Sequence, residues 1–462
     1  MRGLVLEKHA TSGGLVNSFV RDGFLFDGGI REVENAGMVK PMLKELYPES
    51  TADVDMVIAV IAKFDVYMQV LFGSDSPFFK DAKRDIRYYL STFIVWCARF
   101  LATGTAIMRM SLPMEQFLGQ LLENQALRDI ISLHFFKKTP SFFAMGYFSL
   151  HPDYYYPKGG VGSIPKALAQ RLAERGSEVR TKAEVIKVDA SLRTITHRKG
   201  NEYTYDKLVW CADLKSLYTN ISFEGFAVKQ TEAILREQKR ILSSRGAESV
   251  FTLFPTVELS PEYFSDISGG LFFYTPSRNG LGELHRSELA ALLAGPLDHD
   301  GVYPWLKSFC RLNTYEISIP VPNDGSAAPE WETGLIISFL FDYDLTRRIE
   351  EDGWYDQFER RISGLMIATL AESVYPGLEE HVLFSFTASP LSIQRKFSCS
   401  EDTIVGWSFE QEVSIEAGML NMKKAIRSPI PDICRAGQWT VSCIMTARMA
   451  ADLVHAELSS LP

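Results

Sequence analysis

The sequence lacks the short cysteine and histidine spacings that bind metals or form disulfide frameworks. Its 6 cysteines include no CxxC pair, and its 8 histidines include no HxxxH or HExxH spacing. Structural zinc sites use such spacings, and small secreted folds use closely spaced cysteines. We therefore expect no metal site, and reduced, buried thiols as in a cytoplasmic protein.

Positive charge is also scarce. The chain has a net charge of -9 and no run of more than three basic residues, whereas a nucleic-acid binder needs a basic face to neutralise phosphates. We therefore expect no nucleic-acid partner. With 462 residues, 46% of them hydrophobic and 23% charged, the chain is long enough to form two or three domains with large cores.

No basic region leads into an apolar segment at the start of the chain, which predicts no secretory signal and a cytoplasmic location. The most apolar stretch, residues 88–107, has about the length of a membrane span but contains Arg99 and Gly104. This stretch predicts a helix that is buried or lies on a membrane surface, in preference to one that crosses the membrane.

Segments typical of an α/β domain alternate along the chain with segments of other secondary structure. Residues 1–37, 156–221 and 396–462 carry short strands and glycine turns, whereas residues 38–155 show helical periodicities with many aromatic residues. Residues 222–395 combine strand-like and helical runs, which predicts a mixed sheet with helices on one face. We expect an α/β protein in which the first three segments form one discontinuous domain, interleaved with an α+β domain and a helical subdomain.

Local signals predict individual elements. Ser163 as a cap, Pro165 in the first turn and Gly176 as a stop predict a helix between them. A hairpin is expected at residues 199–201, and a closing helix at 446–458. Strands are expected at residues 207–210, 270–274, 314–321, 335–341, 403–407 and 433–436.

The segment that begins with Leu4-Val5-Leu6 has the features of a dinucleotide site. An acidic residue at the end of a strand, here Glu7, can bind ribose hydroxyls. The following Gly13-Gly14 pair allows the main chain to approach a cofactor closely. Each feature taken alone is more typical of a solvated carboxylate and of an ordinary turn, so the interpretation depends on the other segments.

Four segments together resemble the FAD-dependent phytoene desaturase, carotenoid isomerase and retinol saturase family, within the amine oxidase-type superfamily. They are residues 5–29 (VLEKHATSGGLVNSFVRDGFLFDGG), residues 154–189, which contain PKGGVGSIPKALAQRLAERG, residues 208–218 (LVWCADLKSLY) and residues 434–454 (CRAGQWTVSCIMTARMAADLV). The resemblance implies a Rossmann-like FAD-binding domain, with Val185 as the adenine contact and main-chain amides near Gly437 facing the flavin. The cofactor-binding residues that it implies are Glu7, Lys8, Gly13, Gly14, Ser18, Gly28, Gly29, Val185, Gly437, Gln438 and Met445.

The chain departs from this family at its start and near its end. The family's opening strand and GxGxxG turn, which hold the pyrophosphate, are not found, so a sheet without its first strand and with unpaired edges is expected. The turn at residues 159–163 is not expected to replace the missing turn, because Pro157 precedes it. In the terminal motif, Gln438 and Cys443 stand where the family commonly has an acidic residue and a glycine.

The resemblance implies hydride transfer between flavin and a C=C or C–C bond of a hydrophobic isoprenoid or polyene, by desaturation, isomerisation or saturation. Residues 88–148 could line a tunnel for it, lie on a membrane that supplies it, or form an ordinary core. No catalytic acid or base is identified: His151, Asp153, Tyr154 and Tyr155 could lie near the cofactor, but their spacing favours none of them. The alternatives are an amine-oxidase-like flavoenzyme and a degenerate homologue that acts as a partner protein. A homodimer is a further option.

Overall fold

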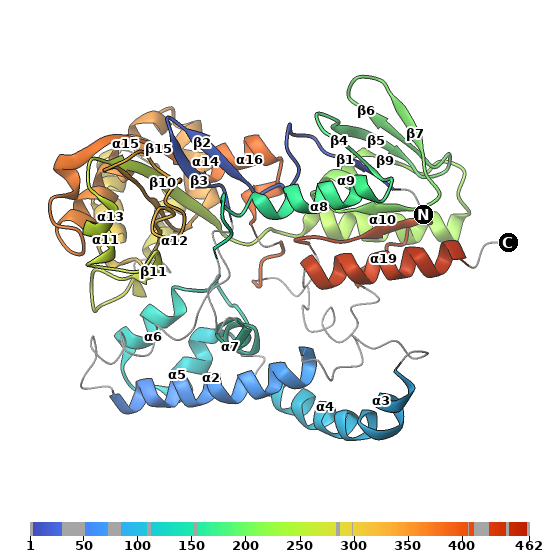
Figure 1. Ribbon diagram of the computed structural model, residues 1–462, viewed down its shortest axis with the longest axis horizontal. Helices are drawn as coiled ribbons and strands as arrows, with labels where there is room; N and C mark the ends of the chain where they lie inside the picture. Colours follow the sequence, from blue (N-terminus) through green and yellow to red (C-terminus); the bar gives the residue numbers. More distant parts are fainter. Residues whose placement is uncertain are drawn as a thin grey trace.

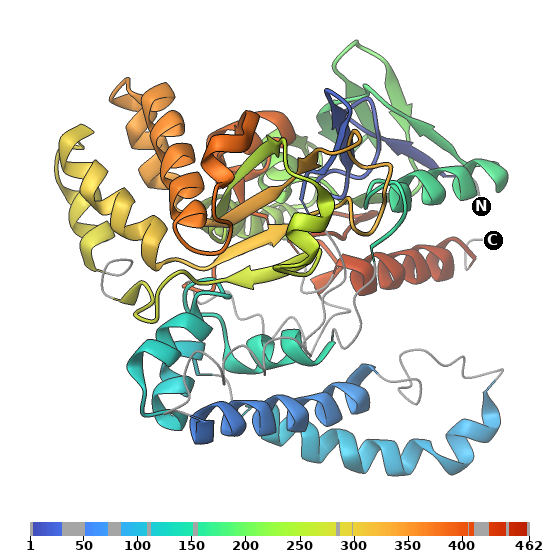
Figure 2. The same cartoon turned by 60° about the vertical axis from the view of Figure 1, so that its left-hand side comes forward.

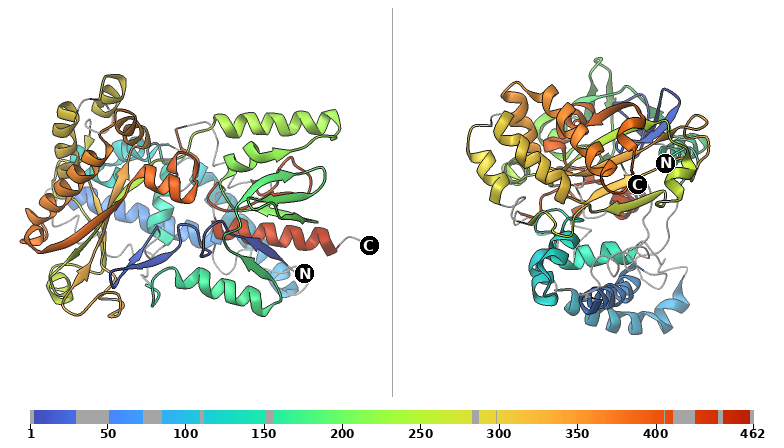
Figure 3. Two further views of the ribbon diagram at one scale, coloured as in Figure 1. Left: turned by 90° about the horizontal axis from the view of Figure 1, so that it is seen from above. Right: turned by 90° about the vertical axis from the view of Figure 1, so that its left-hand side faces the viewer.

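The computed structural model describes residues 3–29, 51–72, 85–108, 112–150, 156–282, 287–297, 299–404, 406–410, 425–439 and 443–459. Its elements form two lobes with a layer of helices beneath them (Figure 1). The first strand and the last helix, which are far apart in the sequence, lie in the same lobe, at one end of the molecule (Figure 3).

The lobe that contains these two elements, here called the terminal lobe, has small separate sheets. Its strands are β1 (Leu4–Leu6), β4 (Glu178–Arg180), β5 (Val185–Asp189), β6 (Thr194–His197), β7 (Glu202–Thr204), β8 (Leu208–Trp210), β9 (Ile221–Ser222) and β16 (Ile433–Arg435). Its helices are α8 (Ser163–Glu174), α9 (Leu214–Asn220), α10 (Val228–Ser243) and α19 (Cys443–Ser459). β1 pairs in parallel with β4, β16 in parallel with β8, and four strands follow the order β7-β6-β5-β9.

The second lobe, here called the central lobe, is built on a 6-stranded sheet in the order β11-β12-β14-β10-β13, with β15 also paired to β10. These strands are β10 (Ser249–Val257), β11 (Leu271–Tyr274), β12 (Tyr315–Ser318), β13 (Thr333–Gly334), β14 (Ile336–Phe341) and β15 (Val382–Ala388). Around them lie α11 (Pro261–Ser265), α12 (Leu289–Ala294), α13 (His299–Leu312), α14 (Tyr343–Glu351), α15 (Tyr355–Ala371), α16 (Pro390–Phe397), η5 (Leu378–His381) and η6 (Ser400–Asp402). Almost every residue of β10 is buried, which suits a strand with neighbours on both edges.

The helical layer contains α2 (Thr51–Phe72), α3 (Ile86–Ser91), α4 (Phe93–Met108), α5 (Met114–Leu121), α6 (Gln125–Ser132) and α7 (Ser141–Leu150). It has a hydrophobic core of its own, in which Phe64, Leu118, Leu127 and Met145 are fully buried. Figure 2 shows α2, α3 and α4 along the lower edge of the molecule. No helix in the described ranges has the length and apolar character needed to cross a membrane.

Several elements confirm the sequence expectations. The helix predicted before Gly176 is α8, although its N-cap is Gly162 and not Ser163. The hairpin through residues 199–201 joins β6 to β7, and the closing helix is α19. The strands expected at 207–210, 270–274, 314–321, 335–341 and 433–436 are β8, β11, β12, β14 and β16.

Two expectations are corrected. The sheet expected to be mixed in residues 222–395 is antiparallel in all its described pairings, because turns and helices reverse the chain between its strands. The prediction of a strand at residues 403–407 is wrong. Among the described residues of this segment, Trp407 forms only an isolated β-bridge to Gly246. Gly406 has a φ of +99°, and Thr403 Oγ1 donates to its carbonyl oxygen at 2.6 Å, so this segment turns instead of extending.

Two segments pack in a different lobe from the one to which the domain boundaries expected from the sequence assign them. The hairpin of β2 (Ser18–Arg21) and β3 (Phe24–Asp27) packs on the central lobe, where Phe26 lies against Phe254 and Phe386. Helix α10 packs in the terminal lobe, where Ile234 and Ile241 share a core with Trp210. The division into a discontinuous FAD-binding domain and a substrate domain stays a prediction.

The sequence predicts that the missing first strand leaves two strand edges without hydrogen-bond partners. The described residues pair differently at these two edges, which belong to β1 and β16. β1 pairs only with β4 among the described strands. The outer side of β16 is hydrogen-bonded to the preceding segment, because Arg435 N donates to Ile426 O at 2.9 Å and Ser428 Oγ donates to Ile433 O at 2.7 Å. The chain's own residues therefore satisfy part of the β16 edge.

An ion pair across the terminal lobe gives a testable pH dependence. Burial opposes ionisation of Glu237, but hydrogen bonds from Arg240 and Arg435 outweigh it and lower the pKa of this carboxyl from 4.5 to about 2. A lowered pKa stabilises the fold above the unfolded-state pKa, and this stabilisation is lost as the pH falls towards 2. We expect Glu237→Gln to reduce the free energy of unfolding by about 3 kcal/mol at pH 7 and to flatten its pH dependence below pH 4.5.

Urea unfolding between pH 7 and pH 3 measures this difference. Glu174→Gln, which removes an exposed carboxylate paired with Arg171 on α8, is the matched control and should cost less than about 1 kcal/mol. Parallel pH profiles for wild type and Glu237→Gln would contradict the prediction.

Candidate functional site

The first part of the candidate site lies where β1 ends. Glu7 N donates to Arg180 O at 2.8 Å, and Ala183 N donates to Glu7 O at 2.8 Å. These bonds hold the strand end beside the chain that enters β5, whose first residue is the predicted adenine contact Val185. The structure thus places Glu7 beside Ala183, two residues before Val185, although the two segments are far apart in the sequence.

The carboxylate of Glu7 is only partly engaged. Its Oε1 accepts a hydrogen bond from His9 N at 2.8 Å, and no described residue donates to Oε2. The side chain is half-buried. A half-buried carboxylate with one available oxygen at a strand end suits the binding of two adjacent hydroxyl groups.

The other N-terminal residues of the predicted site fix the local chain. Lys8 Nζ donates to Ser398 Oγ at the end of α16, so it links β1 to the central lobe. Val16 N donates to Gly13 O at 2.9 Å and Gly28 N donates to Asn17 O at 2.8 Å. The remaining positions are close to the same loop: Gly14, whose carbonyl accepts from Asn17 Nδ2, and Gly29, which packs on the main chain of Leu15.

Ser18 belongs to a buried polar cluster centred on Asp27, which is 1% exposed. Asp27 accepts from Ser18 Oγ at 2.5 Å, from Tyr156 Oη at 2.8 Å and from Val161 N at 3.0 Å. Ser18 Oγ in turn accepts from Gly162 N at 2.8 Å. The hydroxyl of Ser18 is therefore used within the protein, between the β2–β3 hairpin and the start of α8.

The glycine turn before α8 has its amides occupied by protein groups. Besides the bonds to Asp27 and Ser18, Gly159 N donates to Asp324 Oδ2 at 2.7 Å. Two carboxylates thus take the place that a phosphate would need at this helix start. The geometry agrees with the sequence prediction that residues 159–163 are not the pyrophosphate turn.

The second part of the candidate site is the segment between β16 and α19. Gly437 has a φ of +100° and lies against Cys211 O, which follows β8. Gln438 Nε2 donates to Thr403 O at 3.4 Å. Met445 is in the first turn of α19, but its side chain lies outside the described residues.

Trp439 leaves a polar atom available beside these residues. Its side chain is buried and packs on Trp407, with ring centroids 4.4 Å apart. Its Nε1 is buried and has no hydrogen-bond acceptor among the described residues. A buried donor of this kind is unfavourable unless a ligand or water accepts from it.

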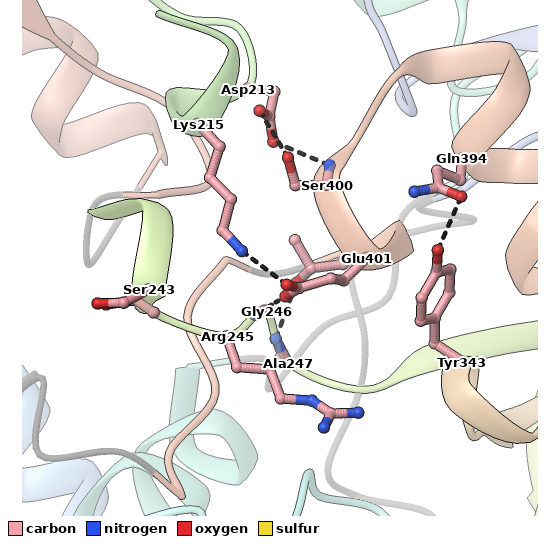
Figure 4. A network of polar contacts seen from close by, with 12 residues as sticks. Asp213, Lys215, Ser243, Arg245, Gly246, Ala247, Tyr343, Gln394, Ser400 and Glu401 are labelled. Atoms are coloured by element: carbon pink, nitrogen blue, oxygen red, sulfur yellow. Dashed lines mark hydrogen bonds and ion pairs between the residues drawn. The ribbon is translucent and has the colours of Figure 1, made fainter. Parts of the chain in front are cut away.

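A polar network joins the two lobes next to this segment (Figure 4). Asp213, the N-cap of α9, accepts from Ser400 N and from Ser400 Oγ, both at 2.9 Å. Lys215 Nζ donates to Glu401 Oε1 at 2.6 Å, and Glu401 Oε2 accepts from Gly246 N at the entrance to β10. The network fixes the segment at residues 400–404, in which the carbonyl oxygen of Thr403 accepts from Gln438 Nε2.

The sequence reasoning did not identify Asp27, Asp213, Lys215 or Glu401. Asp213 could have been identified from the sequence as a helix cap, because an aspartate directly before a helical segment is a preferred N-cap. Asp27 and Glu401 have partners more than 130 and 150 residues away in the sequence. No local pattern predicts such contacts. The acid or base candidates at residues 151–155 lie outside the described residues.

The residues present fit the two ends of FAD. At the nucleoside end, Glu7 offers Oε2 beside the start of β5. At the flavin end, Trp439, which follows Gly437 by two residues and belongs to the core of the terminal lobe, has a buried donor. The turn at residues 159–163 is excluded as the pyrophosphate site, because its amides already donate to Asp27 and Asp324.

Comparisons with known proteins support a flavin cofactor. A family model described as flavin containing amine oxidoreductase matches residues 117–277. A search of curated protein sequences gives no match. The family match supports the FAD that the sequence predicts.

Solved structures share the fold at low sequence identity. A putrescine oxidase variant redesigned in its cofactor binding has 14% identity and a TM-score of 0.56, over 98% of this chain and 93% of that one. Cyclohexylamine oxidase from Brevibacterium oxydans has 12% identity and a TM-score of 0.52, over 98% and 94%. An oxidoreductase from Methanosarcina mazei has 10% identity and a TM-score of 0.52, over 98% and 94%. The chain therefore has the fold of these oxidoreductases.

Two adjacent glycines test the structural role of the turn before α8. Both have positive φ, +81° at Gly159 and +79° at Gly160. A Cβ at Gly160 would lie 2.2 Å from Ser18 Oγ, whereas nothing lies within 4 Å of a Cβ at Gly159. We expect Gly159→Ala to cost about 1 kcal/mol of unfolding free energy, and Gly160→Ala about 1–3 kcal/mol more. Urea unfolding measures both; equal losses would show that the contact with Ser18 and Asp27 is unimportant.

Proposed function

We propose that the protein is an FAD-dependent oxidoreductase that transfers a hydride between a carbon of its substrate and flavin. The observation that carries the proposal is the position of Glu7, whose Oε2 is available at the end of β1 beside Ala183 and β5, in a fold shared with putrescine oxidase. When bound, FAD would supply the hydride acceptor or donor.

The chain's own residues would bind and orient the cofactor. Glu7 would accept hydrogen bonds from ribose hydroxyls, and Val185 would contact the adenine through its main chain. Trp439 Nε1 would donate to the flavin end, and Gly437 would allow close approach of the main chain. The network of Asp213, Lys215 and Glu401 would act indirectly, by holding the segment to which Gln438 donates.

For the substrate we favour a hydrophobic isoprenoid or polyene, as in the phytoene desaturase-like proteins that the sequence resembles. Support comes from the helical layer, where aromatic side chains form a column along α3 and α4. The ring centroids of Phe93 and Trp96 are 6.3 Å apart, and those of Trp96 and Phe100 are 4.7 Å apart. Trp96 is itself buried against α2, so the support is the apolar and aromatic character of this layer, which suits a substrate with few polar groups.

A second candidate is the oxidation of an amine. A small cavity of about 50 Å³ lies between the helical layer and the central lobe, and its lining includes Glu115, Asp129 and Glu248. Lys137 also lines it and pairs with Glu248 at 3.5 Å, so Glu115 and Asp129 are the carboxylates considered for an ammonium group. Carboxylates at the edge of an apolar cavity favour an ammonium group. The named neighbours, putrescine oxidase and cyclohexylamine oxidase, act on amines.

Cofactor binding is tested with Glu7→Gln. We expect the purified protein to bind FAD with quenching of flavin fluorescence, and the substitution to weaken binding about tenfold, because hydrogen bonds to a charged acceptor contribute about 1.5–3 kcal/mol. Glu178→Gln is the matched control: Glu178 lies on the adjacent strand β4, and among the described residues its carboxylate pairs only with Arg180. It should bind FAD as wild type does. A wild-type protein that neither carries nor binds FAD would contradict the proposal and favour a partner protein.

Substrate class is tested with the FAD-loaded protein. We expect the conversion of a linear polyene in detergent micelles to change its absorption spectrum, and no oxygen consumption with putrescine or cyclohexylamine. If the reverse is found, Glu115→Gln should raise the KM for the amine about tenfold, because it removes a carboxylate from the cavity. Anaerobic reduction of the flavin by each substrate separates the two candidates independently of oxygen reactivity.

A further inference from the structure

Helices α3 and α4 expose a continuous apolar surface. Leu90 is 79% exposed, Ile94 74% and Leu101 70%, and Ile86 and Val95 are also more than half exposed. Leu90, Ile94 and Leu101 are spaced by four and seven residues, which places them on one side of a helix. Thr92 N donates to Tyr88 O at 2.8 Å and Trp96 N donates to Thr92 O at 2.9 Å, so the helical pattern continues across the junction of α3 and α4.

The opposite side of α4 is attached to the protein. Trp96 is buried and its Nε1 donates to Val70 O, at the end of α2, at 2.7 Å. Phe93 and Phe100 pack along the same side. Because this contact fixes the rotation of α4, the apolar residues face away from the rest of the molecule. In both Figure 1 and Figure 2, α3 and α4 form its lower edge.

The charge of this surface differs from that of the whole chain. The protein has a net charge of -9, yet residues 86–114 contain no Asp or Glu. Arg87 and Arg99 are exposed there, and neither forms an ion pair among the described residues. Both therefore keep their positive charge available for an external anionic group.

We propose that α3 and α4 form a docking surface for a lipid bilayer that contains anionic lipids. The apolar side chains of Leu90, Ile94 and Leu101 enter the boundary between headgroups and acyl chains, with the helices parallel to the membrane. The arginine side chains at the edge of this surface reach the phosphates. Docking of this surface requires neither FAD nor catalysis.

A second copy of the chain fits this surface less well. A two-fold symmetric contact would place the same patch on both protomers, so that Arg87 and Arg99 of one copy face a patch that again has no acidic residue. Like charges brought together in an apolar contact oppose association. An anionic bilayer supplies both the apolar phase and the negative charge.

Flotation of the full chain with lipid vesicles tests the proposal. We expect wild type to float with vesicles of phosphatidylcholine and phosphatidylserine, and more weakly with phosphatidylcholine alone. The double variant Leu90→Glu/Ile94→Glu should lower the partition coefficient tenfold or more. Arg87→Gln and Arg99→Gln should each lower it about fivefold on the anionic vesicles only, since each basic residue near such a surface contributes about 1 kcal/mol.

The matched control is Leu192→Glu/Val228→Glu, which makes the same charge change at residues 72% and 75% exposed in the terminal lobe. It should float as wild type does. Wild type that stays in the lipid-free fraction with both vesicle types would overturn the proposal, as would equal losses in the two double variants. A wild-type dimer in light scattering that Leu90→Glu/Ile94→Glu converts to a monomer, without any flotation, would show instead that the surface binds a second copy.

Discussion

The carboxylate of Asp27 holds together three segments that are distant in the sequence. It is buried at the end of β3, and its donors come from Ser18 in the same hairpin, from Tyr156 and from Val161 in the turn before α8. The hairpin packs on the central lobe through Phe26, while α8 belongs to the terminal lobe. A buried carboxylate left without donors would be strongly destabilising. The position of α8 and β4, and hence that of β1 and Glu7, therefore depends on these bonds.

A second connection between the lobes works in the same way near Gln438. Asp213 and Lys215 belong to α9, in the terminal lobe, and they bind Ser400 and Glu401 in the segment that leaves the central lobe. Glu401 reaches back to Gly246 at the entrance to β10. Because the charges are paired and mostly shielded from solvent, these bonds contribute more than exposed ion pairs do. Both halves of the candidate cofactor site thus adjoin a polar junction between the lobes.

Local signals explain which parts of the fold the sequence could predict. The helix α8, the hairpin through Gly200 and the strand β14 follow from caps, turn residues and periodicity, which act within a few residues. The strand expected at 403–407 failed because Gly406 turns the chain to fit the main chain of Gln438, about thirty residues later. The packing of the β2–β3 hairpin and of α10 depends on partners such as Phe386 and Ile433, which no local pattern specifies.

In the candidate site, too, local features could be predicted, whereas contacts between distant segments could not. The end of a strand just before Glu7 and the start of a strand at Val185 are local features that the sequence predicts. Their roles as ribose and adenine contacts stay predictions, and that of Val185 is implied only by the resemblance. The hydrogen-bond partners of the turn at residues 159–163 could be predicted only in part. Its glycines indicate a helix start with available amides, yet Asp27 and Asp324 occupy them. A tethered carboxylate binds such amides at a high effective concentration, and its charge repels phosphate. The pyrophosphate of a bound FAD must therefore receive its hydrogen bonds from donors outside this turn.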